Sequence, residues 1–429
     1  MGVNFILQGA EANISRIKKG TEILQEEWNK TEQKAGDVFS DVRVTVKFHE
    51  GMELEVKRMK ADVEIDCHEP AHFFRGLNWV LNHLEKAEGE SEKKEKAYFA
   101  GNGLMLDCSR NAVFTVEKVK AMIRILAKLG LNRLLLYTED TYEVPELPYF
   151  GVYRGRYSRE EIREIDEYAQ IFGIELIPCI QTLAHLHNAL KWSEAQKIMD
   201  TPDILQVGKE ETYEFIEKLL TAVKDSFHTR KIHLGMDEAV QLGLGNYLKE
   251  NGYKNSSELI KEHCARVLEI CRKLGLEPMI WSDMYITSNT GKSYYEVPEN
   301  ADCSDWKKPA PELGLVYWDY YNADTKIYEK CSMYINSFPI KSYLQADAGS
   351  GTGLRRTIPE ALPVRKRHLP PVRNMKFRKC SVQRGWTMVQ RHLWMQFCRE
   401  LHCLHTWDSM KNLTKQHWKT SFRMLWEAA

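Results

Sequence analysis

From residue 103 onward, short apolar segments alternate with amphipathic helical segments, and this alternation constrains the fold more than any other feature of the chain. We predict parallel strands for the apolar segments, because each is followed by a helical pattern of ten residues or more. More than five such units without a G-x-G-x-x-G loop favour a closed (β/α)8 TIM-type barrel over a doubly wound sheet. The six predicted strands are 103–107, 133–137, 174–178, the run from 231 to the Asp237-Glu238 pair, 278–281 and 314–318.

Helix start and stop signals separate these strands. Thr115 is a predicted N-cap, and Ser158 with Glu161 forms a predicted capping box. Gly130 and Gly275 are predicted to end helices.

Residues 1–98 are predicted to form a small α+β domain with a linker, which precedes a barrel domain over 99–345. The domain combines strand patterns and helix patterns, and its last helix follows Pro70. The charged run 85–96 is predicted to be a solvated linker. The remaining elements predicted in this domain are strands at 3–7, 42–48 and 52–56 and helices at 11–34 and 71–84.

Composition bounds the class of protein. A chain of 429 residues with 43% hydrophobic residues can bury a large core, and no apolar run reaches the length that spans a membrane. The opening stretch 1–7 is too short and uncharged for a signal peptide, so we expect a cytoplasmic protein. The ten cysteines are scattered without a C-x-x-C motif, so we predict neither disulfides nor a structural zinc site.

Polar or aromatic residues follow all six predicted strands. The carboxyl ends of barrel strands meet at one mouth, where active sites of such barrels lie, so we expect these clusters to share a pocket. The clusters are Asp107–Arg110, Glu139-Asp140, His185, Asp237-Glu238, Trp281–Asp283 and 318–321.

Asp237 and Glu238 are the strongest candidates for acid chemistry. Side chains alternate along a strand, so adjacent carboxylates can face one point only where the strand has ended. We therefore expect different roles for the two residues. The alternative is a solvated strand-to-helix turn, because carboxylates favour the first turn of a helix.

The pattern His-x-Gly-x-Asp-Glu, with His233, Gly235, Asp237 and Glu238 in place, resembles the catalytic motif of the family 20 glycoside hydrolases, the β-N-acetylhexosaminidases. The resemblance extends from about residue 50 to about residue 325. It implies removal of a terminal β-linked GlcNAc or GalNAc from a glycan, with retention and without a cofactor or metal. It also implies that Glu238 is the general acid/base and that Asp237 orients the substrate's 2-acetamido group, which is the nucleophile.

The same resemblance implies roles at the first three strands. His185 matches the family's Pro-x-x-x-x-x-Gly-His, although Gln181 stands where an Asp usually orients that His. Asp107 and Arg110 match an Asp-x-x-Arg motif after the first strand. Asn102 replaces the Arg that grips sugar hydroxyls in many members of the family.

Glu139 and Asp140 take the place of an acidic pair of the family. The alternatives for this pair are contact with sugar hydroxyls and simple loop solvation, and the sequence favours neither.

Aromatic residues follow the last two predicted strands. Trp281 and Trp318 are candidate walls for the acetamido pocket, because an N-acetyl methyl group and a sugar face both pack on aromatic rings. Either Trp could instead belong to the core. Tyr320 is a weaker candidate for a hydrogen bond to the acetamide, and Asp283 is predicted to bind sugar or to cap the next helix.

Residues 346–429 depart from the barrel pattern. Residues 351–429 carry 16 Lys and Arg against 4 Asp and Glu, with neither strand alternation nor helical stripes. A nucleic-acid-binding arm is one interpretation, which we do not favour because no nucleic-acid module precedes the tail. We also treat the cluster of His402, Cys403 and His405 as an accident rather than a metal site.

We interpret this basic tail as the product of a shifted reading frame. Trp and Met each have a single codon ending in G, so a shift that joins this G to the next two bases forces particular residues. The pairs 386–387, 388–389 and 394–395 must become Asp, Gly and Asp, and the re-read segment resembles a strand ending in Trp-x-Asp-Asp-Gly-Ala-Glu. As written, the chain is expected to lack the last two barrel strands and to be an inactive or vestigial glycan-binding relative if the tail is genuine.

The nucleotide sequence of the gene across codons 335–429 tests this interpretation. We expect an independent determination to show one base gained or lost in this stretch, which would restore the family pattern. An unchanged frame would mean that the basic tail is the natural sequence.

Overall fold

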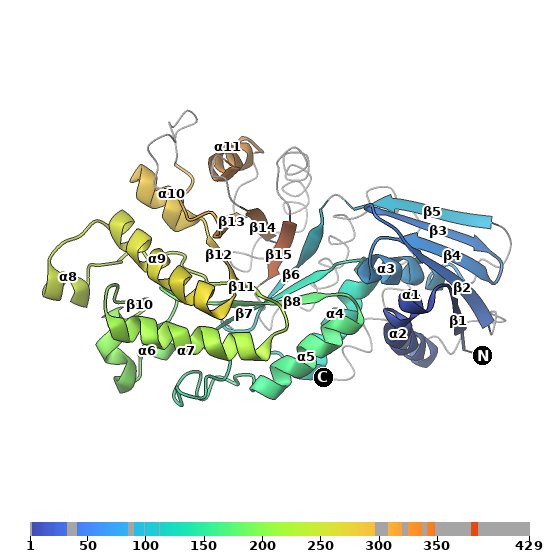
Figure 1. Cartoon of the computed structure of the whole chain (residues 1–429), viewed down its shortest axis with the longest axis horizontal. Helices are drawn as coiled ribbons and strands as arrows, with labels where there is room; N and C mark the ends of the chain where they lie inside the picture. The colour runs from blue at the N-terminus through green and yellow to red at the C-terminus, as the bar shows by residue number, and fades with distance from the viewer. Residues whose placement is uncertain are drawn as a thin grey trace, which may run out of the picture.

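The protein comprises a small mixed-sheet domain beside a closed α/β barrel (Figure 1). The computed structural model describes residues 2–31, 41–84, 90–97, 99–110, 112–296, 308–319, 325–336, 341–347 and 379–384. Tyr320, most of the basic tail and the His402–His405 cluster lie outside these described residues.

The N-terminal domain is a five-stranded sheet with strand order β1-β2-β4-β3-β5. Alternate residues of β2 and β3 are buried, as expected for a sheet that is covered on one face. The helix predicted over 11–34 is divided into two helices by a turn at 16–17. The domain contains β1 (Asn4–Gln8), α1 (Glu11–Ser15), α2 (Lys18–Thr31), β2 (Asp41–Phe48), β3 (Glu53–Met59), β4 (Asp62–Cys67), α3 (Pro70–Leu81) and β5 (Glu90–Lys96).

The prediction of a solvated linker over 85–96 was wrong for its second half, because β5 pairs antiparallel with β3. Cross-strand ion pairs join Lys94 to Glu55 and Lys96 to Glu53. Neither face of this edge strand is fully buried, so a strand made entirely of charged residues and one Ser is tolerated. Charged side chains on an edge also oppose pairing with another chain.

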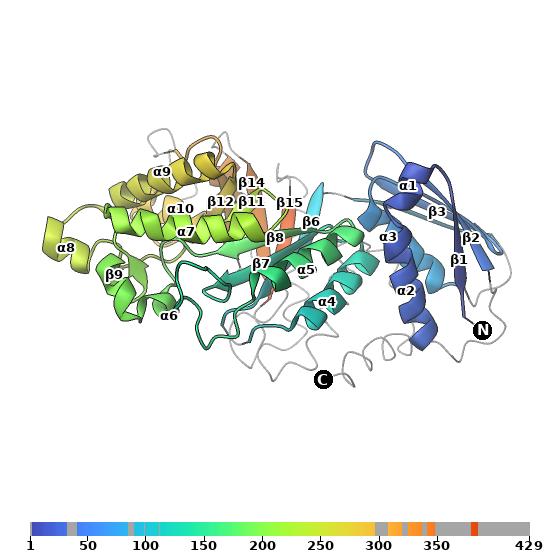
Figure 2. The same cartoon turned by 60° about the horizontal axis from the view of Figure 1, so that its bottom comes forward.

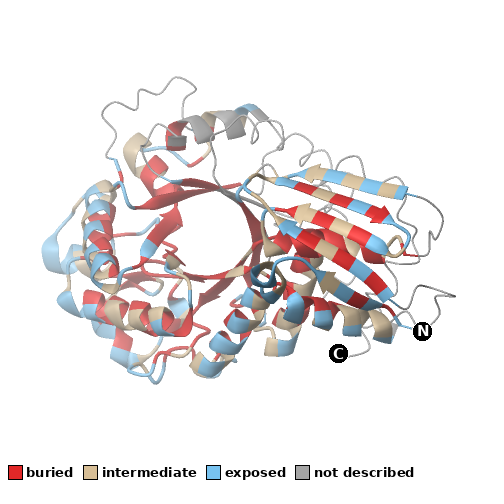
Figure 3. Ribbon diagram, turned by 45° about the vertical axis from the view of Figure 1, so that its right-hand side comes forward, coloured by how far each residue is buried: buried red, intermediate tan, exposed pale blue. Residues whose placement is uncertain are grey.

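Eight parallel strands close the barrel in the order β11-β12-β13-β14-β15-β6-β7-β8 (Figure 3). The six predicted strands are all present, and β6 is buried along its whole length. The TIM-type fold is therefore confirmed. The barrel strands are β6 (Gly101–Asp107), β7 (Arg133–Glu139), β8 (Glu175–Ile180), β11 (Lys231–His233), β12 (Glu277–Trp281), β13 (Gly314–Asp319), β14 (Ser342–Asp347) and β15 (Lys379–Arg384).

The expectation that the last two barrel strands are lost was wrong. β14 pairs with β13, and β15 pairs with both β14 and β6, which closes the ring. Strand pairing uses main-chain N–H and C=O groups that nearly every residue carries, so a strand can form where the side-chain pattern is weak.

Three helices between the barrel strands begin or end at the predicted capping residues. The side chain of Thr115 accepts a hydrogen bond from the N–H of Lys118, and Ser158 with Glu161 forms the complete capping box. Gly130 and Gly275 end α4 and α9 in the left-handed conformation. These elements are α4 (Val116–Leu129), α5 (Arg159–Ile171), α6 (His187–Leu190), a 3-10 helix (Ser193–Ile198), β9 (Met199–Thr201), β10 (Ile204–Leu205), α7 (Glu210–Ser226), α8 (Asn246–Asn251), α9 (Ser256–Leu274), α10 (Asp283–Thr290) and α11 (Thr325–Asn336).

The helices of the N-terminal domain lie between its sheet and the barrel helices α4 and α5 (Figure 2). At this junction the ring of Phe74 meets that of Phe172 edge-on, with centroids 5.1 Å apart. Glu27 forms ion pairs with Arg124 and Lys128 of α4. The two domains are therefore joined by both apolar packing and charge.

No helix among the described residues is long and apolar enough to cross a membrane. Cys264 and Cys271 are buried free thiols on the buried side of α9. The other buried free thiols are Cys67, Cys108, Cys179 and Cys331.

Replacing Phe74 with Ala is expected to lower the free energy of unfolding by about 3–5 kcal/mol, because its ring is fully buried where α2, α3 and α5 meet. Urea denaturation followed by circular dichroism measures the change. Tyr253→Ala is the control, since Tyr253 is 75% exposed and its loss should change stability by less than about 0.5 kcal/mol. Equal losses in the two variants would contradict the role of Phe74.

Candidate active site

The Asp237-Glu238 pair lies in a turn beyond the end of β11, which stops at His233. Gly235, Met236 and Glu238 all have positive φ angles, of 73°, 68° and 53°. This backbone buries the Asp237 side chain, which is 12% exposed, and leaves that of Glu238 56% exposed. The next helix begins only at Asn246, so the pair does not form the first turn of a helix.

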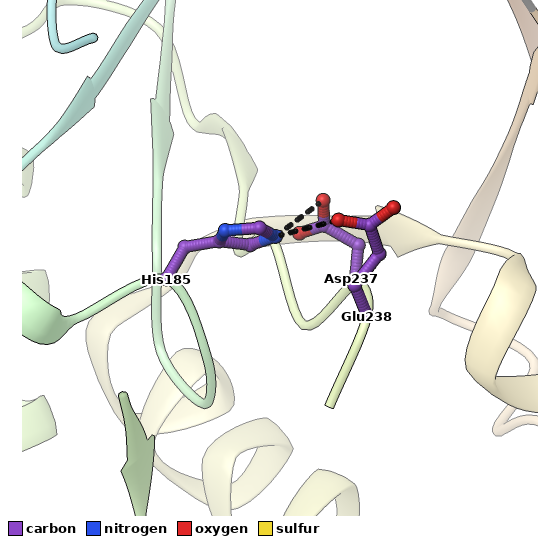
Figure 4. A group of neighbouring side chains, drawn as sticks. All are labelled: His185, Asp237 and Glu238. Atoms are coloured by element: carbon purple, nitrogen blue, oxygen red, sulfur yellow. Dashed lines mark ion pairs between the residues drawn. The ribbon is translucent and has the colours of Figure 1, made fainter. Parts of the chain in front are cut away.

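His185 points its ring toward both carboxylates, which lie side by side (Figure 4). Its Nε2 is 3.2 Å from Oδ2 of Asp237 and 3.5 Å from Oε2 of Glu238. Burial alone would lower the pKa of His185, but the contacts with Asp237 and Glu238 outweigh burial and raise it to about 11. The imidazole is therefore protonated at neutral pH and carries the positive charge that both carboxylates face.

Asp237 is held as an anion. Burial opposes its charge, but His185, the Gln181 amide and the Arg110 charge together keep the pKa of Asp237 below its usual value. Nε2 of Gln181 donates a hydrogen bond of 2.8 Å to Oδ1 of Asp237. Both carboxylate oxygens thus have partners within the protein.

Gln181 and Tyr137 are site residues to which the sequence assigned no role at Asp237. Nε2 of Gln181 also donates to the Tyr137 hydroxyl at 3.1 Å, which in turn donates to Oε1 of Glu139 at 3.0 Å. The signal available in the sequence was that each lies at or just after the carboxyl end of a predicted strand. Their partners depend on how neighbouring strands are aligned, which the sequence pattern does not specify.

The Asp107 and Arg110 motif forms one side of the same site. Asp107 accepts hydrogen bonds from the backbone N–H of Ser109 and Arg110 and from the Arg110 guanidinium at 3.1 Å. Arg110 also donates to the Tyr137 hydroxyl at 3.1 Å. Glu139 accepts from Ser109, and burial raises the pKa of Glu139 above its usual value. Glu139 is thus a buried, hydrogen-bonded residue at the end of β7 rather than a solvated loop residue.

Asp283 and Trp318 form the opposite side. Asp283 accepts hydrogen bonds from the backbone N–H of Glu238 at 2.9 Å and from Nε1 of Trp318 at 3.2 Å. Burial, reinforced by the nearby charge of Asp237, raises the pKa of Asp283 to about 7. Although α10 begins at Asp283, this carboxyl group holds the turn at Asp237-Glu238 in place.

Trp281 and Trp318 are both buried, and each has an aromatic neighbour. The Trp281 ring lies 4.2 Å from that of His233, and the Trp318 ring stacks on Tyr294 at 5.1 Å. The wall of an acetamido pocket therefore stays a prediction for both. Tyr320, the third aromatic candidate, lies outside the described residues.

His185, Asp237 and Glu238 offer ligand-type atoms within 4.8 Å of one another. This spacing alone would suit a cation. The same three side chains also form an ion-paired cluster on their own, because His185 contacts both carboxylates.

A parallel eight-stranded barrel with acid groups at the carboxyl ends of its strands is the usual architecture of a TIM-barrel enzyme. The model of the glycosyl hydrolase family 20 catalytic domain matches residues 99–315, just over half of the chain. The chain belongs to this family.

Relatives in the same family are distant in sequence. A "Probable beta-hexosaminidase" of Arthroderma benhamiae is 25% identical over 307 residues, which cover 62% of this chain and 49% of that protein. Human "Hexosaminidase D" is 25% identical over 230 residues, which cover 50% of this chain and 44% of that protein. The chain thus spans about half the length of these curated relatives.

Solved structures share the fold. The exo β-N-acetylglucosaminidase of Vibrio harveyi, solved in complex with N-acetylglucosamine, superposes with a TM-score of 0.67 at 16% identity. The superposition covers 98% of this chain and 73% of the Vibrio protein.

The ion pairs of His185 predict a pH-dependent contribution to stability. Its pKa rises from 6.5 to about 11 on folding, so the stabilisation is complete below pH 6.5 and is lost as the pH rises through 11. The difference in urea midpoint between the parent and His185→Asn should therefore shrink as the pH is raised from 6 to 10. His187→Asn, two residues along and exposed, is the control and should show a constant difference.

Proposed function

We propose that this protein is an exo-acting β-N-acetylhexosaminidase that removes a terminal β-linked GlcNAc or GalNAc from glycans, with retention of configuration. The observation that carries the proposal is the different environment of two consecutive carboxylates. Both carboxylates contact His185, but Glu238 is exposed at the barrel mouth, whereas Asp237 is buried and also held by Gln181. One carboxyl group is free to exchange a proton with substrate, and the other is a fixed anion.

The partners of Asp237 argue against a nucleophilic role for this residue. In the usual retaining mechanism a second carboxylate attacks the sugar carbon. The oxygens of Asp237 already face Gln181 and His185, which suits a residue that accepts a hydrogen bond from substrate without leaving its position. Family 20 enzymes are an exception in which the substrate's own acetamide is the nucleophile.

In the proposed reaction Glu238 donates its proton to the glycosidic oxygen as the bond from this oxygen to the anomeric carbon breaks. The acetamide carbonyl oxygen of the substrate forms a bond to the same carbon and produces an oxazolinium ion. Asp237 accepts a hydrogen bond from the acetamide N–H and stabilises the positive charge that develops on the oxazolinium ring. Glu238, now ionised, takes a proton from water as the water opens the ring and restores the acetamide.

The name of each relative supports the substrate class. Two curated relatives carry hexosaminidase in their names, and the Vibrio structure contains N-acetylglucosamine. Arg110 forms ion pairs with Asp107 and Glu139, and we propose that these three side chains bind sugar hydroxyls. Trp281 and Trp318 are proposed to pack against the N-acetyl group.

Glu238→Gln is expected to lower kcat toward an aryl N-acetyl-β-glucosaminide by about 10²–10⁴-fold, because an amide cannot donate the catalytic proton. Asp237→Asn should also reduce kcat strongly, since it removes the anion that stabilises the oxazolinium ion. Released aryl alcohol is the readout. Glu258→Gln, at the exposed start of α9, is the matched control and should retain parent activity.

Two results would contradict the proposal. Either catalytic variant could hydrolyse the substrate as fast as the parent, which would exclude this mechanism. The parent itself could bind N-acetylglucosamine without turnover, which would indicate a glycan-binding relative that has lost activity.

A further inference from the structure

Exposed apolar side chains gather at the mouth of the barrel. Among the described residues, eight large hydrophobic side chains are exposed, and six of them lie between β7 and α5 or between β11 and α9. Single exposed apolar residues are common on protein surfaces, whereas a cluster beside a site marks a binding surface. Four of the six follow the Asp237-Glu238 pair directly in the chain. They are Val240, Leu244, Leu248 and Tyr253, with exposed fractions of 82%, 51%, 39% and 75%.

The segment that carries these side chains is firmly held from below. Asp200, on β9, is buried, and its carboxylate accepts three backbone hydrogen bonds from the segment. The donors are the N–H groups of Gly243 at 2.7 Å, Gly245 at 3.2 Å and Tyr247 at 2.8 Å. Leu242 is buried as well. The exposure of the other apolar side chains is therefore set by a fixed backbone.

The helix α8 ends this segment and has no buried residue. It lies at the end of the molecule away from the N-terminal domain (Figure 1). The N-terminal domain therefore does not cover the apolar side chains of this segment.

The exposed segment is continuous with the proposed acid group. The backbone N–H of Val240 donates to the carbonyl oxygen of Glu238 at 2.7 Å, so the two residues share one tight turn. Both side chains reach solvent from this turn. The oxygen that Glu238 protonates also carries the leaving group, so the leaving group lies on the exposed side of Glu238. A leaving group that extends along the turn contacts Val240.

The chemistry of the segment selects the kind of group that it can bind. Residues 239–248 include no Asp, Glu, Lys, Arg or His, although 28% of the whole chain is charged. The exposed side chains at positions 240, 244 and 248 are aliphatic. Aliphatic side chains offer neither an aromatic ring for a sugar face nor a hydrogen bond for a hydroxyl group. They gain binding energy only by burying apolar surface.

We propose that Val240, Leu244 and Leu248 form an apolar aglycone surface, which binds an alkyl or acyl chain on the leaving-group side of the terminal N-acetylhexosamine. The inference rests on the proposed function and names its substrate class, β-N-acetylhexosaminides with an alkyl-chain aglycone. Each methylene group that leaves water on this surface should tighten binding by up to about fourfold.

The test compares kcat/KM for n-octyl and methyl N-acetyl-β-glucosaminide, with the octyl substrate kept below the concentration at which it forms micelles. Both substrates release an unbranched alkanol of similar acidity, so the ratio of the two values reports contacts of the chain. The parent should favour the octyl substrate by about tenfold or more, because several methylene groups leave water. A ratio near one would overturn the proposal.

Variants locate the contact. Val240→Ser and Leu244→Ser should each lower the octyl-to-methyl ratio by about threefold or more, because less apolar surface is buried. Ile6→Ser is the matched control, since Ile6 is also aliphatic and 41% exposed but lies on β1 of the N-terminal domain. Its ratio should equal that of the parent. Equal ratios in the parent and all three variants would overturn the proposal.

A second copy of the chain is the alternative occupant, because an apolar patch can pair with itself in a symmetric dimer. Sedimentation velocity of the parent and of Leu248→Lys distinguishes the two cases. A monomeric parent supports the aglycone surface. A dimeric parent that Leu248→Lys converts to a monomer, with the octyl-to-methyl ratio unchanged, would overturn it.

A binding measurement separates this inference from the proposed function. Isothermal titration calorimetry gives the dissociation constants of both glycosides for Glu238→Gln and for the double variant that also carries Leu244→Ser. Tighter binding of the octyl glycoside, reduced in the double variant, supports the surface. If the parent hydrolysed neither glycoside, this result would contradict the proposed function alone. Equal dissociation constants for the two glycosides would overturn the inference.

Discussion

Closure of the ring of parallel strands is the constraint on which the rest of the structure depends. Each barrel strand pairs with two neighbours, and β15 completes the ring by pairing with both β14 and β6. Because all eight strands run in one direction, their carboxyl ends meet at one mouth. Tyr137 and Asp237, which are 100 positions apart in the chain, thereby accept hydrogen bonds from the same side chain, Gln181.

The charges at this mouth are stabilised by their partners rather than by solvent. Asp237 and Asp283 are both buried. The imidazolium of His185 keeps Asp237 ionised, whereas burial and the charge of Asp237 favour protonation of Asp283. Environments that separate the pKa values of neighbouring carboxyl groups are typical of acid–base sites. The exposed Glu238 lies between these two groups in the chain and in the hydrogen-bond network.

The sequence predicted the elements whose side chains carry a pattern. The capping box at Ser158 and the helix end at Gly275 are local signals, and the structure has both. The sequence did not predict β5, because this strand consists almost entirely of charged residues. It did not predict β15 either, because the pairing of this strand relies on main-chain groups rather than on a side-chain pattern. The motif at Asp237-Glu238 was visible, whereas the contact from Gln181 depends on alignment between strands, with Cys179 of β8 opposite His233 of β11.

The absence of a side chain at Gly235 has a consequence for how the site can change over evolutionary time. A Cβ at this position would lie 2.0 Å from Oε1 of Gln181, and the φ angle of 73° already disfavours any other residue. The backbone carbonyl of Ile180 would also lie 2.8 Å from such a Cβ, and it stays there whichever residue occupies position 181. Position 235 is therefore held as glycine by the main chain itself, so this part of the site can change over time at 181 but not at 235.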